Sequence, residues 1–256
     1  MSWSPDQYLR FAAPRLRPAA DLLAAVPLAA PRAVVDLGCG AGNVTRLIGE
    51  RWPAARVTGV DDSAAMLAKA AQEFPRARWQ QCGIADWRAG EPVDLIYSNA
   101  ALQWLGDHER LFPSLLAQLA PGGVLAVQMP RNFEAPSHRE IANTVRSGPW
   151  RERLAPLLVP SPVAAPGVYY EILAPLAARL DIWETEYLQV LEGEDPVKEW
   201  TKGTWLRQFL DALADDAERA AFEANYAARL RLAYPRRSDG RTLFPFRRLF
   251  LVAAAP

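Results

Sequence analysis

The chain has 256 residues, 50% of them hydrophobic, with 29 basic and 29 acidic side chains. This length is enough for one full hydrophobic core, and the balanced charge disfavours nucleic acid as the main partner, since such proteins usually carry a basic excess. Cys39 and Cys82 form no disulfide or zinc framework, so we expect a reduced cytoplasmic compartment and no metal. The sequence shows neither a signal peptide nor a stretch able to span a membrane.

The N-terminal region, residues 1–30, predicts helices. The stretch SPDQ at residues 4–7 is typical of a helix start, with a capping serine and a proline at the first helical position. Pro14 and Pro18 are expected to divide the residues after this start into two short helices, because proline removes a backbone hydrogen bond. The second of these helices is expected to end near Ala25.

Strands and helices alternate from residue 31 to residue 130. Alternation at this spacing is typical of βαβ units and of a parallel sheet. Ser63 is expected to cap the helix after it. The expected strands cover 31–38, 55–61, 77–83, 92–99 and 122–130, the last after a Pro-Gly-Gly turn, and the expected helices cover 43–51, 63–73 and 108–119.

The pattern changes after Pro130. Six prolines between residues 149 and 175 predict an irregular or broken-helix segment that covers the sheet rather than joining it. Residues 181–191 alternate like a strand, residues 196–233 show helical spacing of apolar side chains, and the chain ends in another expected strand.

A glycine loop comes after the first expected strand, in the stretch Asp36-Leu37-Gly38-Cys39-Gly40-Ala41-Gly42. Glycines at a strand-to-helix turn bring backbone N–H groups and a helix start towards a ligand. The dinucleotide pattern G-x-G-x-x-G would need glycine at position 43, where this chain has Asn43. Asp36 suits a ligand with a cation, such as an amino-acid ammonium, and disfavours a pyrophosphate.

This stretch resembles the first motif of class I S-adenosylmethionine-dependent methyltransferases, D/E-x-G-x-G-x-G. The resemblance implies a Rossmann-like, seven-stranded, mostly parallel sheet with helices on both faces, an antiparallel final strand and a helical cap. It implies S-adenosylmethionine as cofactor. Asp61, at a strand end, can accept both ribose hydroxyls, and the stretch from Asp61 to Leu67 resembles D-x-S-x-x-M-L, whose methionine, here Met66, lies against adenine.

The third expected strand departs from that family. Relatives place an acid at its end to bind the adenine amino group, whereas this chain has Gly83, so we expect Asp86 or Trp87 to substitute while the Ile84 backbone meets adenine. The segment from Ser98 to Leu105 resembles the one that passes under the methionine portion. The predicted cofactor contacts are Asp36, Gly38, Gly40, Asn43, Asp61, Asp62, Met66, Gly83, Ile84, Asp86, Trp87, Asn99, Ala100 and Trp104.

The flanks of the chain resemble the trans-aconitate methyltransferase family. The similar stretches are 3–11, 15–19, 52–56, 125–130, 181–183 and 246–253. This family implies transfer of the methyl group to a carboxylate of trans-aconitate, giving a monomethyl ester and S-adenosylhomocysteine. We therefore expect one domain, 1–256, divided into an N-terminal helical lid (1–30), a cofactor-binding core (31–130), cap insertions (131–180 and 195–240) and closing strands (181–191 and 244–255).

A carboxylate is already ionised at neutral pH, so this reaction needs no general base and the sequence offers none. His108 is expected near a helix start and His138 in a polar loop. The expected role of the protein is in-line positioning, with arginine forks and hydroxyls anchoring the other carboxylates. Of Arg247 and Arg248, which alternate on a strand, the family pattern favours Arg248. The predicted substrate contacts are Tyr8, Phe11, Arg15, Arg17, Gln103, Arg131, Tyr170 and Arg248.

Two alternatives stay open. The first is a methyltransferase of the same fold that acts on another small carboxylic acid or small molecule; a hydroxyl or amine acceptor would more often need a base. The second is an NAD-type oxidoreductase, which Asp36 and Asn43 disfavour. We expect a tricarboxylate as the partner, no nucleic acid or membrane, and a monomer or weak oligomer.

Overall fold

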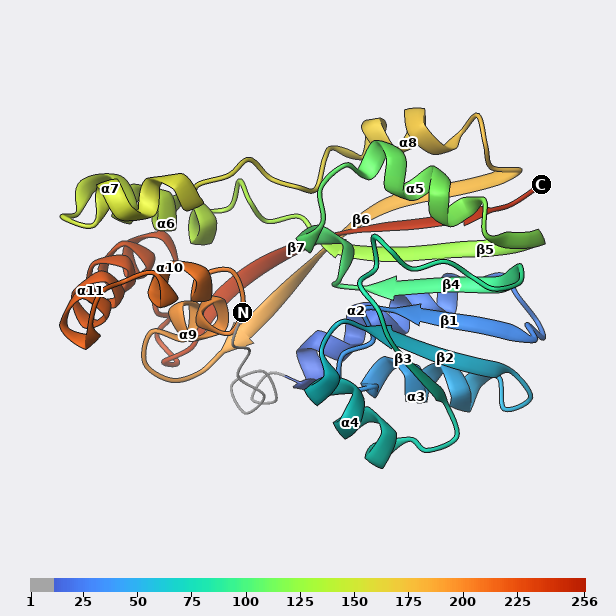
Figure 1. The fold of residues 1–256 in the computed structure, drawn as a ribbon. Helices are drawn as coiled ribbons and strands as arrows, with labels where there is room; N and C mark the ends of the chain where they lie inside the picture. The colour runs from blue at the N-terminus through green and yellow to red at the C-terminus, as the bar shows by residue number, and fades with distance from the viewer. Residues whose placement is uncertain (1–11) are drawn as a thin grey trace. The chain divides into compact units, whose positions relative to one another are not determined.

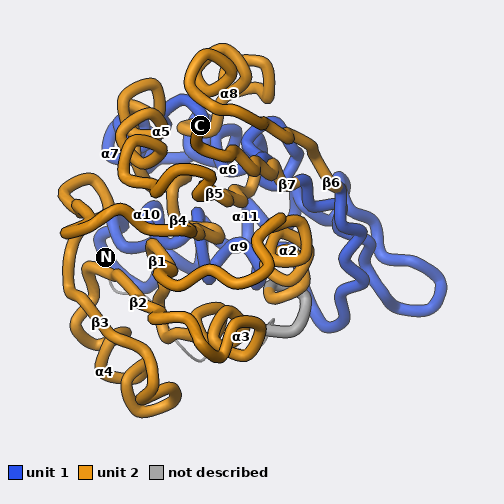
Figure 2. Tube along the Cα trace, turned by 90° about the vertical axis from the view of Figure 1, so that its right-hand side faces the viewer, with its two compact units in different colours: residues 1–14, 131–161, 186–247 blue, residues 15–130, 162–185, 248–256 orange. Residues whose placement is uncertain are grey.

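The computed structural model describes the backbone of residues 12–256 and the side chains from residue 16 onward. The chain divides into two compact units, shown in blue and orange in Figure 2. Unit 1 comprises residues 1–14, 131–161 and 186–247, and unit 2 comprises residues 15–130, 162–185 and 248–256. Residues 162–180 of the expected cap therefore belong to the unit that contains the expected core. The single domain expected from the sequence stays a prediction.

A seven-stranded sheet runs through the fold in the order β3-β2-β1-β4-β5-β7-β6. Pairing is parallel from β3 to β5, and β7 is antiparallel to β5, which confirms the expected architecture. β6 and β7 each have residues in both units. The strands are β1 (Ala33–Leu37), β2 (Arg56–Asp61), β3 (Arg78–Gln81), β4 (Val93–Asn99), β5 (Leu119–Pro130), β6 (Arg179–Leu191) and β7 (Thr242–Ala254).

Helices cover both faces of the sheet in unit 2. Figures 1 and 2 show α2 and α3 on one face, with α5 and α8 on the other. Ser63 caps α4 by accepting a hydrogen bond from the Met66 amide at 3.4 Å, as predicted. The helices of this unit are α2 (Ala12–Ala25), α3 (Asn43–Arg51), α4 (Ala64–Glu73), the short 3-10 helix η1 (Leu102–Trp104), α5 (His108–Leu116) and α8 (Pro166–Leu173).

Two local predictions in unit 2 are wrong. Helix α2 continues through Pro18 rather than ending before it, and it ends at Ala25 as expected. Its Ala19 and Leu22 are buried, and the Tyr97 hydroxyl donates to the Ala19 carbonyl at 2.6 Å, so packing on the sheet outweighs the hydrogen bond lost at the proline. The Pro-Gly-Gly turn lies inside β5, which begins at Leu119, and the strand absorbs it through a register shift against β4.

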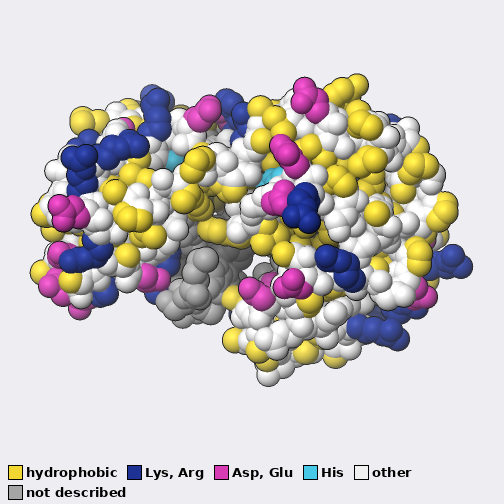
Figure 3. All heavy atoms as spheres, turned by 45° about the horizontal axis from the view of Figure 1, so that its top comes forward, with side chains coloured by type: hydrophobic (Ala, Val, Ile, Leu, Met, Phe, Trp, Pro, Cys, Tyr) yellow, Lys and Arg dark blue, Asp and Glu magenta, His cyan; other side chains and the backbone are white. Residues whose placement is uncertain are grey.

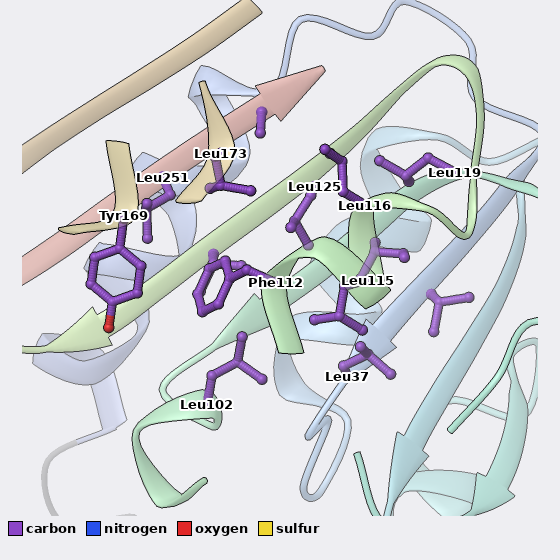
Figure 4. Close-up of a cluster of buried hydrophobic side chains, with 14 of the residues drawn as sticks. Leu37, Leu102, Phe112, Leu115, Leu116, Leu119, Leu125, Tyr169, Leu173 and Leu251 are labelled. Carbon is purple, nitrogen blue, oxygen red and sulfur yellow. The ribbon is translucent and has the colours of Figure 1, made fainter. Parts of the chain in front are cut away.

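The hydrophobic core of unit 2 lies between the sheet and helices α5 and α8. Figure 4 shows Phe112 and Leu115 of α5 beside Leu125 of β5, with Tyr169 of α8 close to Phe112. The Phe112 and Tyr169 ring centroids are 5.1 Å apart. His108, at the start of α5, contacts the Tyr169 hydroxyl through Nδ1 at 2.7 Å and the Leu102 carbonyl through Nε2 at 3.0 Å. These contacts make His108 a structural residue.

Unit 1 has its own core of buried aromatic and aliphatic side chains, among them Trp200, Phe222 and Tyr226. His138 lies in helix α6 rather than in a loop, and burial lowers its pKa to about 4. The helical region expected at 196–233 consists of three helices. The helices of this unit are α6 (Pro136–Ser147), α7 (Arg151–Leu154), η2 (Ala155–Leu157), α9 (Pro196–Lys202), α10 (Arg207–Asp211) and α11 (Asp216–Ala233).

Basic and acidic side chains are interspersed on the face shown in Figure 3. Within the part of the chain that the structure describes, no helix combines the length and apolar character that a membrane span requires.

The Tyr169 hydroxyl is expected to stabilise unit 2. The substitution Y169F would leave Nδ1 of the buried His108 without this partner, and the free energy of unfolding should fall by about 1–3 kcal/mol. Urea unfolding of the whole chain measures the change. Y170F is the matched control, because Tyr170 is 61% exposed on the same helix and its loss should change stability little. Equal stability of the two variants would contradict the role of the hydroxyl.

Candidate functional site at the glycine loop

The glycine loop between β1 and α3 is held by close contacts. Gly38 has a φ of +75°, and a Cβ there would lie 2.2 Å from the Ala101 Cβ, so only glycine fits without displacement. The amides of Gly38 and Cys39 both donate to the Val60 carbonyl. In contrast, a Cβ on Gly40 would meet no atom within 4 Å. The loop is therefore packed at Gly38 and open at Gly40.

Asp61 connects the glycine loop to the loop between β2 and α4. At the end of β2, its Oδ2 accepts from the Gly40 amide at 2.8 Å and its Oδ1 accepts from the Ser63 amide at 3.0 Å. Each carboxylate oxygen can accept a further hydrogen bond, so the geometry leaves capacity for a pair of ligand hydroxyls. Asp62 is exposed and Met66 is half-buried in the first turn of α4.

Asp36 lies beneath the loop and is 1% exposed. The Thr45 hydroxyl donates to its Oδ2 at 2.6 Å. Burial, partly offset by Thr45 and reinforced by the charge of Asp61, raises the pKa of Asp36 to about 7. Asn43 is the first residue of α3, as predicted. At neutral pH Asp36 is therefore close to its pKa, and a nearby cation would stabilise the ionised form.

The end of β3 has a carboxylate close to Gly83. A Cβ on Gly83 would lie 3.6 Å from Oδ2 of the exposed Asp86, so this carboxylate occupies the space beside the missing side chain. Ile84 reaches 3.2 Å from the Cβ position of Gly38, which brings the two loops together. Trp87 is 2% exposed and belongs to the core of unit 2, whereas Asp86 is exposed. The adenine contact expected of Asp86 stays a prediction.

The end of β4 leads into a strained turn. Ala100 has a φ of +54°, and its amide donates to the Gln128 carbonyl at 2.9 Å. Gln103 is buried and its Nε2 donates to the Ala100 carbonyl at 2.6 Å, so its oxygen is the group left for a further contact. Asn99 Oδ1 and Gln103 Oε1 are buried and make no hydrogen bond within the described chain. Trp104 is 48% exposed and is not a core residue.

Arg248 of β7 is buried, whereas Arg247 points outward, which confirms the expected alternation. Nη1 of Arg248 donates to Oε1 of Gln128 on β5 at 3.1 Å. The register pairs Pro130 with Arg248 and Gln128 with Phe250, so Arg248 and Gln128 are diagonal neighbours on one face of the sheet.

The remaining predicted substrate residues lie on several elements, and some of them are described only in part or not at all. Tyr8 and Phe11 lie outside the described residues, and of Arg15 only the backbone, in α2, is described. Arg17 is exposed on α2, 3.9 Å from Asp21. Arg131 belongs to unit 1, where its amide donates to the Arg247 carbonyl. Tyr170 is exposed on α8. Their substrate contacts stay predictions.

Three residues of this site were not predicted. Thr45 holds Asp36, Ala101 packs on Gly38, and Gln128 holds Arg248. Gln128 did give a signal, because it is the one polar side chain in the apolar strand sequence VLAVQMP. Among the described residues, no group of three or more metal-ligating side chains comes together.

Comparison with known proteins identifies the class. A family described as "Methyltransferase domain" matches residues 34–123, which contain the glycine loop, Asp61 and the end of β4. YcgJ of Bacillus subtilis is 16% identical and shares the fold with a TM-score of 0.59 over 93% of this chain and 98% of that one. Phosphoethanolamine N-methyltransferase 2 of Haemonchus contortus, solved with S-adenosylhomocysteine, is 16% identical, with a TM-score of 0.56 over 94% of this chain and 52% of that one. Fold and site together define a class I methyltransferase.

A closer relative specifies the family. A protein of Azoarcus sp. (strain BH72) named trans-aconitate 2-methyltransferase is 53% identical over 252 residues, 98% of both chains. The chain belongs to the trans-aconitate 2-methyltransferase family.

The raised pKa of Asp36 predicts that stability falls as the pH rises. The pKa of Asp36 is 3.8 in the unfolded chain and about 7 in the folded protein, so between pH 3.8 and about pH 7 the folded state binds more protons. The free energy of unfolding therefore falls as the pH rises through this range. The variant D36N keeps an acceptor for Thr45 and should flatten this slope. Above about pH 7 it should be more stable than the wild type, by at most about 4 kcal/mol.

Urea unfolding from about pH 4 to about pH 8 measures this slope. D62N is the matched control, since Asp62 is exposed and the same substitution there should leave the slope unchanged. A D36N profile that parallels the wild type would contradict the assignment to Asp36.

Proposed function

We propose that this protein binds S-adenosylmethionine and methylates a carboxylate of trans-aconitate. The cofactor assignment is supported above all by the hydrogen bond from the Gly40 amide to Asp61, because the Asp61 carboxylate can accept further hydrogen bonds and a Cβ on Gly40 would meet no atom within 4 Å. The acceptor assignment rests on the family and on the buried guanidinium of Arg248.

The residues fit each part of the cofactor. Asp61 would bind the ribose hydroxyls, and Met66 and Ile84 would contact adenine, with the Asp86 carboxylate close to the position of the missing acid at Gly83. The buried charge of Asp36 and the amide oxygens of the β4 turn suit an ammonium group. When bound, this cofactor supplies a methyl group on a positively charged sulfur.

The protein's own contribution to the reaction is positioning. A substrate carboxylate is ionised at neutral pH and needs no proton removed, and both ring nitrogens of His108 are engaged in structural contacts. Holding the acceptor in an aligned position can supply several kcal/mol, and up to ~7–11 kcal/mol in ideal cases. Arginine side chains are suited to fix the remaining carboxylates in pairs of hydrogen bonds.

Product analysis tests the reaction. The purified chain, incubated with S-adenosylmethionine and a panel of di- and tricarboxylic acids, should add one methyl group to trans-aconitate, detected by mass spectrometry with S-adenosylhomocysteine as the second product. Methylation of another acid in place of trans-aconitate would reject the substrate and keep the class. Methylation of none, together with thermal stabilisation by NAD and not by S-adenosylhomocysteine, would reject the class.

The arginines should act on substrate affinity more than on cofactor affinity. Replacing Arg15, Arg17 or Arg248 by alanine is expected to raise the KM for the acid by about 10-fold or more for a residue that contacts a carboxylate, with little change in the KM for the cofactor. Arg247, which is exposed, provides the matched control on the same strand. Unchanged kinetics in all three variants would remove these residues from the substrate site.

A further inference from the structure

Gln128, on strand β5 between β4 and β7, has the features of an additional specificity residue. Its side chain is fully buried, and it belongs to no part of the cofactor motif. Its backbone carbonyl accepts from Ala100, and its side-chain oxygen accepts from Arg248 at 3.1 Å. One residue therefore connects the turn after β4 to the buried arginine of β7.

The chemistry of this contact is informative. A glutamate at position 128 would accept the same hydrogen bond and would neutralise the guanidinium. The glutamine present accepts it without adding a negative charge. Its other polar atom, Nε2, is a buried donor with no hydrogen-bond partner within the described chain. The pair thus combines a positive charge with a donor, and both properties suit an anion.

We propose that Gln128 is a positioning residue that sets the selectivity of the site for an acid. Its oxygen holds the Arg248 guanidinium, and because Gln128 is neutral it adds no negative charge that would repel a substrate carboxylate, here one that does not receive the methyl group. This inference rests on the proposed function, since it names the residue that supports the Arg248 contact.

The sheet geometry supports this role. Asn99, Gln128 and Phe250 are paired in register across three strands, and Arg248 lies two residues from Phe250 on the same face. Phe250 stacks on Trp183 with ring centroids 4.9 Å apart, which fixes the backbone next to Arg248. Long side chains of diagonal neighbours in a sheet are within reach of each other, so Gln128 can hold the Arg248 side chain in position.

The decisive variant is Q128E. A purely structural role predicts little change, because the shape and the accepting oxygen are kept and the contact with Arg248 becomes an ion pair. The proposed role predicts that the KM for trans-aconitate rises at least ~10-fold while the KM for S-adenosylmethionine and the thermal stability stay near wild type. Q72E, at an exposed position on α4, controls for the added negative charge.

Two further variants separate charge from packing. Q128M removes the accepting oxygen and should raise the KM for the acid without the charge effect, so it should be milder than Q128E. In the R248M background, Q128E should change the KM for the acid far less than it does in the wild type, because the guanidinium it neutralises is absent.

The outcomes are distinguishable from those of the proposed function. If the wild type methylates trans-aconitate and Q128E has the same KM for the acid, this inference is wrong and the function stands. If Q128E changed the KM for the acid equally in the wild type and in the R248M background, the inference would also be wrong. If the wild type methylates no acid at all, the proposed function itself has failed, and with it this assignment.

Discussion

The carboxylate of Asp61 holds together the two loops on which the candidate site depends. It accepts one amide from the glycine loop and one from the loop before α4, and its own position is fixed by parallel pairing of β2 on both sides. Gly38 completes the arrangement, since its contact with Ala101 leaves no room for a side chain between the first loop and the turn after β4. The site is thus built from ends of neighbouring parallel strands, where the sheet itself sets the spacing.

This arrangement brings two acids close together, and their mutual repulsion contributes to the raised pKa of Asp36. Burying an ionised carboxylate without a nearby cation lowers the stability of the folded protein. Proteins therefore seldom keep such a group unless a function requires it. A ligand with both an ammonium group and neighbouring hydroxyls would satisfy Asp36 and Asp61 together. The electrostatics therefore favour a zwitterionic nucleoside over the pyrophosphate of a dinucleotide, as the sequence already indicated.

The sequence predicted the elements between residues 31 and 130 closely, apart from the start of β5, because short apolar strands and amphipathic helices alternate there at a regular spacing. It predicted α3 at its observed bounds, and strand alternation predicted that only one of Arg247 and Arg248 faces inward, with the family resemblance favouring Arg248. It did not predict the continuity of α2 through Pro18, where tertiary packing overrides a local preference. The polar Gln128 stands out in its apolar strand, but its partner was missed because Arg248 lies more than a hundred residues away on another strand, and no local pattern encodes that pairing.

The charge change during the proposed reaction bears on where arginine should act. The acceptor carboxylate would lose its negative charge on becoming an ester, so a guanidinium bound to the reacting oxygens would stabilise the starting state more than the transition state. Only interactions that strengthen in the transition state accelerate the reaction. An arginine that binds a carboxylate remote from the reaction avoids this penalty, because the charge there does not change. A tricarboxylate provides such remote anions, and a buried Arg248 held by a neutral Gln128 is suited to one of them.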